Sequence, residues 1–460
     1  MIGRDVLMAM LPEHLLLLGI VLLIVLEIAG LARRAAPTVA LATVAAAVWA
    51  AARLSFDGYA AAPFAGHFSV DAASLLAKAL VLALALPVLL IARDEFDGVE
   101  FPVLLLSSLY GVGLMLSADS FLTLFLGLEI MSLPVYVLVL LAYQRAQSAE
   151  AALKYLVLGG TSTAMFLMGV SLLYGGTGSM DIAVFARAIG AADPMARAAV
   201  VLVILAFFLK AAIVPFHAWA PDAYEGASVP VTAYMAVVVK AGVLLAAVRL
   251  FGPATLASPM LELVAVLPLA SIVWGNLAAM RQPSLRRMVA YSSIAHAGYL
   301  FYALLGAPEG RMQSVTFYLL AYGLLNLLVF AALPPAADDR ERDRLDNLKG
   351  LFHRSPFAAL MIGIAMLSLA GIPPFPGFVA KFLIFKNVVA AGHTAYAVLG
   401  LVGSYLGIYF YLRVLQFMFM SADAAIAPAP LRRHALGASL ACVALALLVA
   451  AFPGWVIEHL

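Results

Sequence analysis

The sequence predicts an all-α polytopic membrane protein with about 14 transmembrane helices. Hydrophobic residues make up 65% of the 460 residues and charged residues only 11%, whereas a soluble domain has roughly 45–50% apolar and about 25% charged residues. The mean hydropathy is +1.05. Apolar runs of spanning length recur along the whole chain, and they are continuous rather than alternating, which argues against a β-barrel.

Fourteen apolar runs predict the individual spans, each near the length of about 20 residues that crosses a bilayer. They occupy residues 14–32, 36–54, 71–92, 100–118, 121–143, 151–175, 196–214, 229–250, 258–280, 286–306, 312–335, 356–385, 394–418 and 434–456. The first run is followed by Arg33 and Arg34 instead of a small-residue cleavage site, so we expect a retained span and not a cleaved signal peptide.

Lysine and arginine are distributed unequally over the predicted loops. The rich loops alternate along the chain and contain Arg33, Arg34, Arg93, Arg145, Arg281, Arg286, Arg287, Arg340, Arg342, Arg344, Lys349, Arg354, Arg432 and Arg433. The positive-inside rule places these loops in the cytoplasm, so both termini would face outward, as an even number of spans requires. Residues 338–349 form a strongly charged linker, and we expect a solvated cytoplasmic loop there.

Two predicted helices are interrupted by proline. Span seven ends in AAIVPFHAW at residues 211–219, and span twelve contains AGIPPFPGF at residues 370–378. The two similar stretches lie five spans apart, so they point in opposite directions through the membrane. Inverted repeats with broken helices are typical of transport proteins. We therefore predict two inverted five-helix repeats, helices 4–8 and 9–13, with breaks at Pro215 in helix 7 and at Pro373 and Pro374 in helix 12.

This pattern divides the chain into four parts. They are residues 1–99 for helices 1–3, 100–251 for the first repeat, 252–420 for the second repeat and 421–460 for helix 14. Inverted repeats place a transport site at the interface between them, so we expect functional residues in the two middle parts.

Four charged side chains lie deep inside predicted spans: Glu129, Lys210, Lys240 and Lys381. An ionised group near the bilayer centre costs about 2.5–3.5 kcal/mol even on insertion scales. Glu129 lies about eight residues, or roughly 12 Å, into its span, which is too deep for a short side chain to reach the interface. Together these residues indicate a proton or ion path. The alternatives are a structural ion pair for Glu129, snorkelling for Lys210 and Lys240, and an interfacial position for Lys381.

His296 lies inside span ten. Imidazole titrates near neutral pH and both donates and accepts protons, so it suits a proton relay; a structural histidine with satisfied hydrogen bonds is the alternative. The other basic residues of the spans lie near span ends, where long stems reach the interface. They are Lys78, Lys154, Arg249 and Arg413.

A buried acid and several buried amines can move protons. The proton affinity of an amine falls in apolar surroundings and rises beside a carboxylate. A change of about a thousandfold is worth about 4 kcal/mol, which exceeds the roughly 2.3 kcal/mol needed to move one proton against 100 mV. Such a pump needs an outside source of energy, either a partner or an ion gradient.

The sequence predicts no cofactor and no metal on this chain. It has no nucleotide motif, flavin fingerprint or haem ligand pair, and no Cys/His spacing typical of a metal site. The net charge of +2 and the lack of a basic stripe give no indication of nucleic-acid binding. The driving chemistry is therefore expected in other proteins.

Three stretches of the chain are similar to those of a known family. They are FLGLEIMSLPVY at 125–136 with SAEAALKY at 148–155, KAAIVPFHAWAPDAYEG at 210–226 with PVT at 230–232 and Lys240, and YSSIAHAGY at 291–299 with the span that contains Lys381. Over nearly its whole length the chain resembles the N-type, antiporter-like membrane subunits of bacterial proton-pumping NADH:quinone oxidoreductase, respiratory complex I. The fit departs slightly at Ser228 and Val229, where the family has proline and a small polar residue.

The resemblance implies a translocase subunit that couples electron transfer from NADH to quinone to proton export. NADH, FMN, the iron–sulfur clusters and quinone would be bound by partner subunits of the respiratory chain. The resemblance further implies that Glu129 pairs with Lys210, that Lys240 is the central lysine, that His296 lies in a hydrated connection and that Lys381 lies near the outward exit.

The family also implies neighbours: the M-type and K-type subunits, the lateral helix of the L-type subunit and the lipid bilayer. The short segment after span fourteen argues against the L-type subunit itself, and the lysine in span twelve argues against the M-type. Two alternatives remain open from the residues. One is a subunit of a multisubunit cation/proton antiporter, and the other is a passive scaffold, which would gain stability by losing its buried charges.

Overall fold

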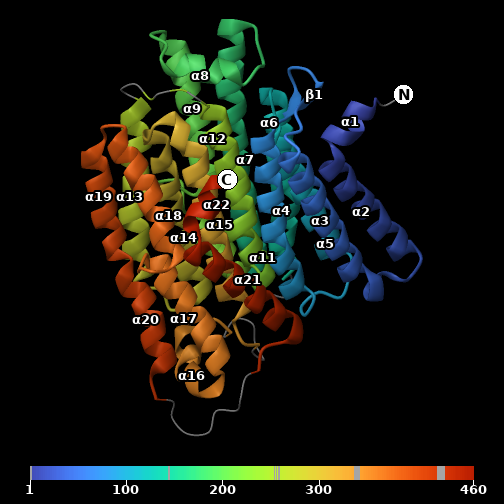
Figure 1. Ribbon diagram of the computed structural model, residues 1–460, viewed down its shortest axis with the longest axis vertical. Coiled ribbons are helices and arrows are strands. Elements are labelled where there is room, and N and C mark those ends of the chain that lie inside the picture. The colour runs from blue at the N-terminus through green and yellow to red at the C-terminus, as the bar shows by residue number, and fades with distance from the viewer. Residues whose placement is uncertain are drawn as a thin grey trace.

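The computed structural model describes residues 3–142, 146–252, 254, 256, 260–335, 342–421 and 430–460. Arg145, Arg340 and the first part of the charged linker, residues 338–341, lie outside them. The described chain forms a bundle of long helices that run up and down along one direction (Figure 1). We call the end that carries the N-terminus the N-terminal face, and the end that carries α16 (Leu351–Arg354) the opposite face.

The first half of the bundle contains eleven helices and one hairpin among the described residues. They are α1 (Arg4–Ala9), α2 (Leu11–Ile28), α3 (Ala32–Phe56), β1 (Ala61–Phe64), β2 (Phe68–Val70), α4 (Ala72–Ala92), α5 (Glu100–Leu116), α6 (Phe121–Leu140), α7 (Ala146–Thr177), α8 (Ala183–Ile189), α9 (Pro194–Ala211), α10 (Trp219–Gly226) and α11 (Val229–Tyr234). The antiparallel β1–β2 hairpin lies at the N-terminal face, and the sequence analysis did not predict it.

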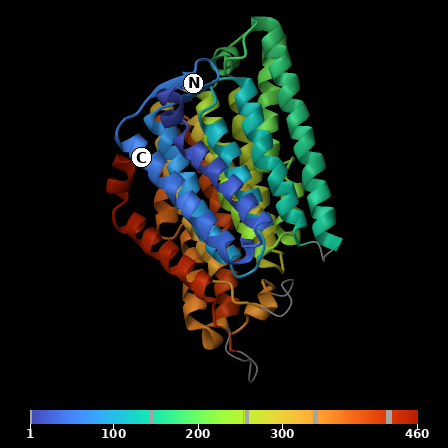
Figure 2. The same cartoon turned by 90° about the vertical axis from the view of Figure 1, so that its right-hand side faces the viewer.

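The second half continues from α11 without a loop. It consists of the π-helix η1 (Met235–Val239), α12 (Lys240–Phe251), α13 (Met260–Ala279), α14 (Leu285–Tyr302), the 3₁₀-helix η2 (Ala303–Leu305), α15 (Pro308–Ala331), the 3₁₀-helix η3 (Leu345–Leu348), α16, α17 (Pro356–Ala370), α18 (Pro376–Ala390), α19 (Thr394–Leu406), α20 (Ile408–Phe419), α21 (Arg433–Ala451) and α22 (Pro453–Glu458). Figure 2 shows α21 along one edge of the bundle, and it packs against α4 and α15.

The prediction of an all-α polytopic membrane protein is confirmed. Twelve helices of the described residues are long and apolar enough to cross a membrane, and two shorter apolar helices, Glu100–Leu116 and Pro356–Ala370, correspond to the other predicted spans. The hairpin is a small addition at one face. The two inverted repeats and the division into four parts stay predictions.

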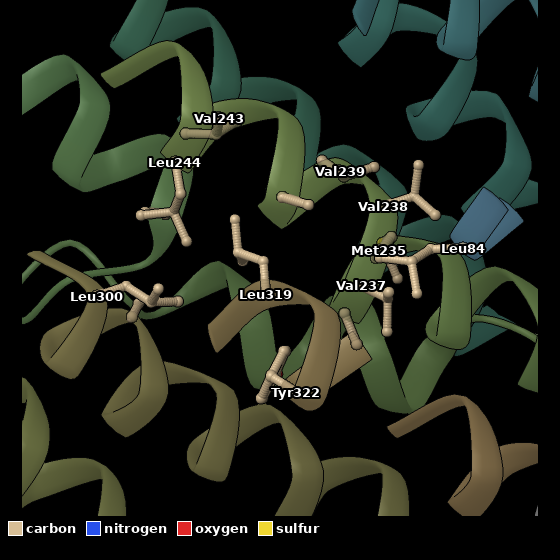
Figure 3. Close-up of a cluster of buried hydrophobic side chains, with 14 of the residues drawn as sticks. Leu84, Met235, Val237, Val238, Val239, Val243, Leu244, Leu300, Leu319 and Tyr322 are labelled. Atoms are coloured by element: carbon tan, nitrogen blue, oxygen red, sulfur yellow. The ribbon is translucent and has the colours of Figure 1, made fainter. Parts of the chain in front are cut away.

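The helix formed by α11, η1 and α12 lies at the centre of the bundle and is buried nearly throughout. Valine, alanine and leucine occupy all its sides, and a helix that is apolar all round is a buried one. Figure 3 shows its side chains packed against Leu84 of α4, Leu300 of α14 and Leu319 of α15. The π-helical turn ends directly before Lys240, and such turns occur frequently at functional sites.

The expectation of a solvated linker is wrong for Arg342 and Asp343, which are both buried. The Asp343 carboxylate accepts hydrogen bonds from the Ser284 hydroxyl at 2.8 Å and from the Arg286 backbone amide at 2.7 Å. Its other oxygen accepts from the Arg286 guanidinium at 3.0 Å. These bonds hold the linker against the start of α14, because the carboxylate satisfies amide and guanidinium donors that would otherwise be buried without partners.

Candidate functional site

Glu129 of α6 and Lys210 of α9 form a loose ion pair. The ammonium nitrogen of Lys210 lies 3.5 Å from Glu129 Oε1 and 3.0 Å from the Ser132 hydroxyl. Thr163 of α7 donates to the same Glu129 oxygen at 2.5 Å. The Lys210 side chain is 6% exposed and that of Glu129 is 22% exposed. Each charged group therefore has a second partner, so the contact between them can weaken without leaving either group unpaired.

The chain breaks after Lys210. Helix α9 ends at Ala211 and is followed by Ala212 at φ +62°, in the left-handed region that closes many helices. The peptide bond between Val214 and Pro215 is cis. The free backbone groups of the break find partners, because the Val214 amide donates to the Ser271 hydroxyl at 2.8 Å and the Trp219 indole donates to the Leu209 carbonyl at 2.9 Å. Polar backbone can exist at membrane depth only where it is satisfied in this way.

Lys240 lies in the centre of the bundle and is 6% exposed. Its ammonium donates to the backbone carbonyl of Ser293 at 2.6 Å and also contacts the Ser293 hydroxyl. The Tyr224 hydroxyl lies 3.3 Å from the same Ser293 hydroxyl. Unlike Lys210, Lys240 has no carboxylate partner among the described residues. A neutral serine and a tyrosine therefore connect it to its surroundings.

His296 is buried one turn further along α14, with both ring nitrogens in hydrogen bonds. Its Nδ1 lies 2.7 Å from the Tyr318 hydroxyl of α15, and its Nε2 lies 3.0 Å from the Tyr411 hydroxyl of α20. Tyr411 also contacts the Ser292 hydroxyl at 2.5 Å. Because Ser292 and Ser293 are neighbours in sequence, the hydrogen bonds of Lys240 and those of His296 reach adjacent residues of one helix.

Lys381 of α18 is 8% exposed and reaches the break in span twelve. Its ammonium donates to the carbonyls of Leu369 and Ala370 at 3.1 and 3.2 Å, and to the Ser404 hydroxyl at 3.0 Å. The last carbonyls of a helix lack intrahelical partners and carry partial negative charge, so the end of α17 binds the ammonium. Gly371, at φ +85°, leaves room for this stem, because a Cβ there would lie 3.2 Å from the ammonium nitrogen.

The structure therefore buries the three predicted lysines and His296 and places Glu129 partly open. Among the described residues, Glu129 and Lys210 are the only two of the five predicted site residues in direct contact. Pro215 lies in the connection between α9 and α10, and Pro373 and Pro374 lie in the connection between α17 and α18. The Pro373–Pro374 peptide bond is also cis.

A polar cavity of about 420 Å³ opens near the opposite face, where α10 meets α7 and α14. Asp222 of α10 accepts hydrogen bonds from Lys154 at 2.7 Å and from Arg287 at 2.8 Å, and Arg287 also contacts Glu225 at 2.9 Å. Burial alone would raise the pKa of Asp222, but the bonds from Lys154 and Arg287 outweigh it and hold the pKa below its usual value. Tyr224 of the same short helix contacts Ser293, so α10 connects this cavity with the partner of Lys240.

One prediction for the other basic residues is wrong. Lys78 was expected to extend to the membrane interface, yet its side chain is 1% exposed and its ammonium lies 2.6 Å from Glu13 Oε1, also 1% exposed. Arg249, for which the same was expected, keeps an exposed fraction of 20% and bonds Asp119 at 3.1 Å and Ser69 at 3.2 Å. The bundle therefore contains a second buried acid–lysine pair, between α2 and α4.

The sequence analysis did not single out several polar residues that contact the predicted ones. They are Ser132, Thr163, Ser293, Tyr318, Ser404 and Tyr411, with Tyr224 and Ser292 connected through Ser293 and Tyr411. Ser292 and Ser293 lie within the YSSIAHAGY stretch, where two adjacent hydroxyls beside a buried histidine were a usable signal. Tyr411 gave no signal, because tyrosines are common along span thirteen and only the folded structure shows which one faces His296.

The fold and the site define a class: a polytopic membrane protein with buried amines at broken and π-helical turns, as in ion-coupled transport proteins. The comparisons narrow that class. The family described as NADH:quinone oxidoreductase/Mrp antiporter, TM matches residues 118–407. The chain is 38% identical to NADH-quinone oxidoreductase subunit N of Pelobacter propionicus, covering 97% of this chain and 96% of that protein. It is 36% identical to subunit N of Granulibacter bethesdensis, covering 82% and 81%.

Comparison with solved structures leads to the same family. A chain of respiratory complex I from Thermus thermophilus aligns with a TM-score of 0.85 at 34% identity, covering 97% of this chain and 98% of that one. A chain of the Mrp complex from Dietzia shares the fold, with a TM-score of 0.84 at 24% identity over 98% and 96% of the two chains. The chain belongs to the NADH-quinone oxidoreductase subunit N family, and it is thus a membrane subunit of an oxidoreductase complex, with other complex I subunits as its partners.

Proposed function

We propose that this chain translocates protons in the membrane arm of NADH:quinone oxidoreductase, through Glu129, Lys210, Lys240, His296 and Lys381. The proposal depends on one observation: the Lys210 ammonium has two hydrogen-bond acceptors, Glu129 at 3.5 Å and Ser132 at 3.0 Å. A lysine that exchanges a carboxylate for a hydroxyl changes its proton affinity, because only the carboxylate favours the charged form. The pair is therefore suited to act as a switch.

In this proposal the N-terminal face is periplasmic and the opposite face cytoplasmic, in a bacterial inner membrane. Protons enter through the 420 Å³ cavity, where Lys154, Asp222 and Arg287 form a charged network. They reach Lys240 by way of Tyr224 and Ser293, whose hydroxyls lie 3.3 Å apart. Hydroxyl groups both donate and accept hydrogen bonds, so such a chain can pass a proton without moving a charged side chain.

Beyond Lys240, His296 receives the proton and Lys381 releases it outward. His296 bonds two tyrosine hydroxyls, so each ring nitrogen can exchange roles between donor and acceptor. Lys381 receives support from two carbonyls at the end of α17 and from Ser404, all neutral groups. A cation without a carboxylate partner is less firmly held in its charged form, which favours release at this point.

The redox chemistry belongs to partner subunits in this proposal. NADH, FMN, iron–sulfur clusters and quinone are bound there, and the M-type subunit, the K-type subunit and the lateral helix of the L-type subunit are the neighbours. Large apolar side chains on α7 support a cover of lipid and protein, since Leu153, Val157 and Met168 are each more than half exposed. Such exposure is expected where bilayer or a partner replaces water.

The test is proton pumping by the assembled complex in vesicles, measured as protons moved per electron. E129Q and K240M should lower this ratio sharply while the complex still assembles. K386M provides the matched control, because Lys386 is an exposed lysine of α18 outside the proposed path. Full pumping by assembled E129Q and K240M would refute the assigned roles.

A further inference from the structure

We propose that Glu13 and Lys78 form a second proton-exchange site, which holds one water molecule and opens toward the N-terminal face. The inference rests on the proposed function, since it assigns a proton task to residues outside the row of Glu129, Lys210, Lys240, His296 and Lys381. Its basis is the contact geometry of the pair, the small cavity beside it and the position of Lys78 near the N-terminal face.

The pair is buried and incompletely satisfied. The ammonium of Lys78 lies 2.6 Å from Glu13 Oε1, but outside this ion pair neither the ammonium nor the carboxylate oxygens have a hydrogen-bond partner in the described part of the chain. An ammonium offers three donors and a carboxylate about four acceptor positions. Leaving such groups unpaired away from water is destabilising, and more so when they are charged. The missing partners indicate a bound molecule.

The space beside the pair fits that molecule. A cavity of about 10 Å³ is lined by both charged residues, by Leu109 and Val112 of α5 and by Gly113. This is about the smallest space that holds one water molecule, and a water there has two charged partners. Gly113 permits this close approach, because a Cβ at this position would lie 2.7 Å from Glu13 Oε1 and the carboxylate would have to shift. The α5 backbone thus comes close to the carboxylate and keeps the space small.

Lys78 lies close to the N-terminal face. Lys78 lies two helical turns, roughly 10 Å, from the helix start at Asp71. Asp71 and Arg249 line a hollow of about 770 Å³ at that face, and their charged groups lie 3.6 Å apart. The Phe68 ring of the β1–β2 hairpin lies 4.8 Å from the Lys78 ammonium and is itself buried. Phe68 therefore covers the lysine against the hollow.

The site also adjoins the central helix. Helix α4 packs against α11 and against η1, the π-helical turn that ends directly before Lys240. The exchange step is a simple proton transfer. The Lys78 ammonium gives one proton to the cavity water, and that water passes a proton outward, leaving Lys78 as a neutral amine. Arg249, which interacts electrostatically with Lys78, compensates the negative charge that remains on Glu13. The amine is recharged by a proton from the interior.

A structural role predicts a different result when the whole pair is replaced. A buried ion pair exchanged for apolar residues of similar size is often neutral or stabilising. The E13L/K78M variant of the complete complex should therefore assemble in either case. Under our proposal it loses protons per electron in vesicles; a purely structural pair leaves the ratio at the wild-type value. A normal ratio would overturn the proposal.

A second measurement tests whether Phe68 shields Lys78 from the hollow. F68A opens Lys78 to the hollow, so resting vesicles of this variant should leak protons faster than the wild type, and adding E13L/K78M should abolish the increase. L75A is the matched control, because Leu75 is a buried residue of the same small cluster and its truncation removes apolar volume while the Phe68 ring stays in place. A leak in F68A no greater than in L75A also overturns the proposal. E129Q and K240M, measured in the same vesicle assay, show separately whether the path proposed under the main function carries protons.

Discussion

Two acid–lysine pairs in the same bundle differ in how they are held. In the pair of Glu129 and Lys210, the charged atoms lie 3.5 Å apart, and Thr163 and Ser132 offer second partners. In the pair of Glu13 and Lys78, the atoms lie 2.6 Å apart and the surroundings are apolar. Both pairs adjoin a cavity of about 10 Å³. The loose pair can change its contacts, whereas the tight pair can change only the positions of its protons.

The difference shows what a buried charge needs in order to be functional. A switch requires an alternative partner that is nearly as good as the first, and hydroxyl groups at 2.5–3.0 Å supply it for Glu129 and Lys210. Where no alternative exists, breaking the contact leaves an uncompensated charge, which typically costs about 3–5 kcal/mol. The tight pair should thus be the more sensitive to loss of one partner, and the loose pair the more sensitive to loss of its hydroxyls.

The largest expected effect follows from removing one partner of the tight pair. K78M leaves the Glu13 carboxylate buried without a cation, and we expect a loss of about 3–5 kcal/mol in stability. K210M should cost less, about 1–3 kcal/mol, because Glu129 keeps the hydrogen bond from Thr163 and some exposure. The yield and the thermal midpoint of the assembled complex measure both. Equal losses of stability in K78M and K210M would contradict the comparison. If the unpaired charge is the cause, E13L/K78M should recover the stability that K78M loses.

A smaller effect is expected from crowding the tight pair. G113A places a methyl group 2.7 Å from Glu13 Oε1, and overpacking of this kind costs about 1–3 kcal/mol. G437A is the control, because a Cβ at Gly437 of α21 meets no atom within 4 Å and alanine is the better helix former by about 1 kcal/mol. The thermal midpoint should fall in G113A and not in G437A. An unchanged midpoint in G113A would mean that α5 yields to make room.

The sequence sufficed for the spans and for placing Glu129, Lys210 and Lys240 within helices, because both depend on counting along apolar runs. The tight pair was missed for a three-dimensional reason. The first span was predicted from residue 14, but α2 begins at Leu11 and so includes Glu13. Lys78 lies near a helix end by count, yet Phe68 of the β1–β2 hairpin folds over it and removes it from water. Local counting cannot show a distant segment that covers a helix end.

The same limit explains the linker and the tyrosines. Asp343 belongs to a charged stretch whose composition predicts a solvated loop. Its burial depends on Ser284 and Arg286, about 60 residues earlier in the chain. Tyr411 contacts His296 across 115 positions of the sequence. Contacts over such distances are decided by packing of the whole bundle, which hydropathy does not encode.

A moderate functional effect should distinguish the hydroxyls of the loose pair. S132A removes the alternative acceptor of Lys210, so the ammonium stays on Glu129 and the switch slows. One hydrogen bond contributes about 0.5–1.5 kcal/mol, which corresponds to a reduction of roughly 2- to 12-fold in coupled turnover. S108A is the control, since the buried Ser108 hydroxyl donates to the Met131 carbonyl at 2.9 Å and not to the pair. Normal turnover in S132A would show that Lys210 does not use this acceptor.

The smallest effect is expected where water reaches the charges, at the 420 Å³ cavity on the opposite face. D222N removes a carboxylate that Lys154 and Arg287 hold at 2.7 and 2.8 Å, and exposed networks contribute about 0.2–1 kcal/mol.

The pKa of Asp222 is lowered in the folded protein, so the contribution of Asp222 to stability is full above the unfolded pKa of about 3.9 and is lost as the pH falls through the folded value. The difference in thermal midpoint between wild type and D222N should therefore be constant from neutral pH down to about pH 4 and shrink as the pH falls further. A difference that grows on acidification would contradict the sign of the shift, and a loss as large as that of K78M would remove the contrast between buried and hydrated pairs.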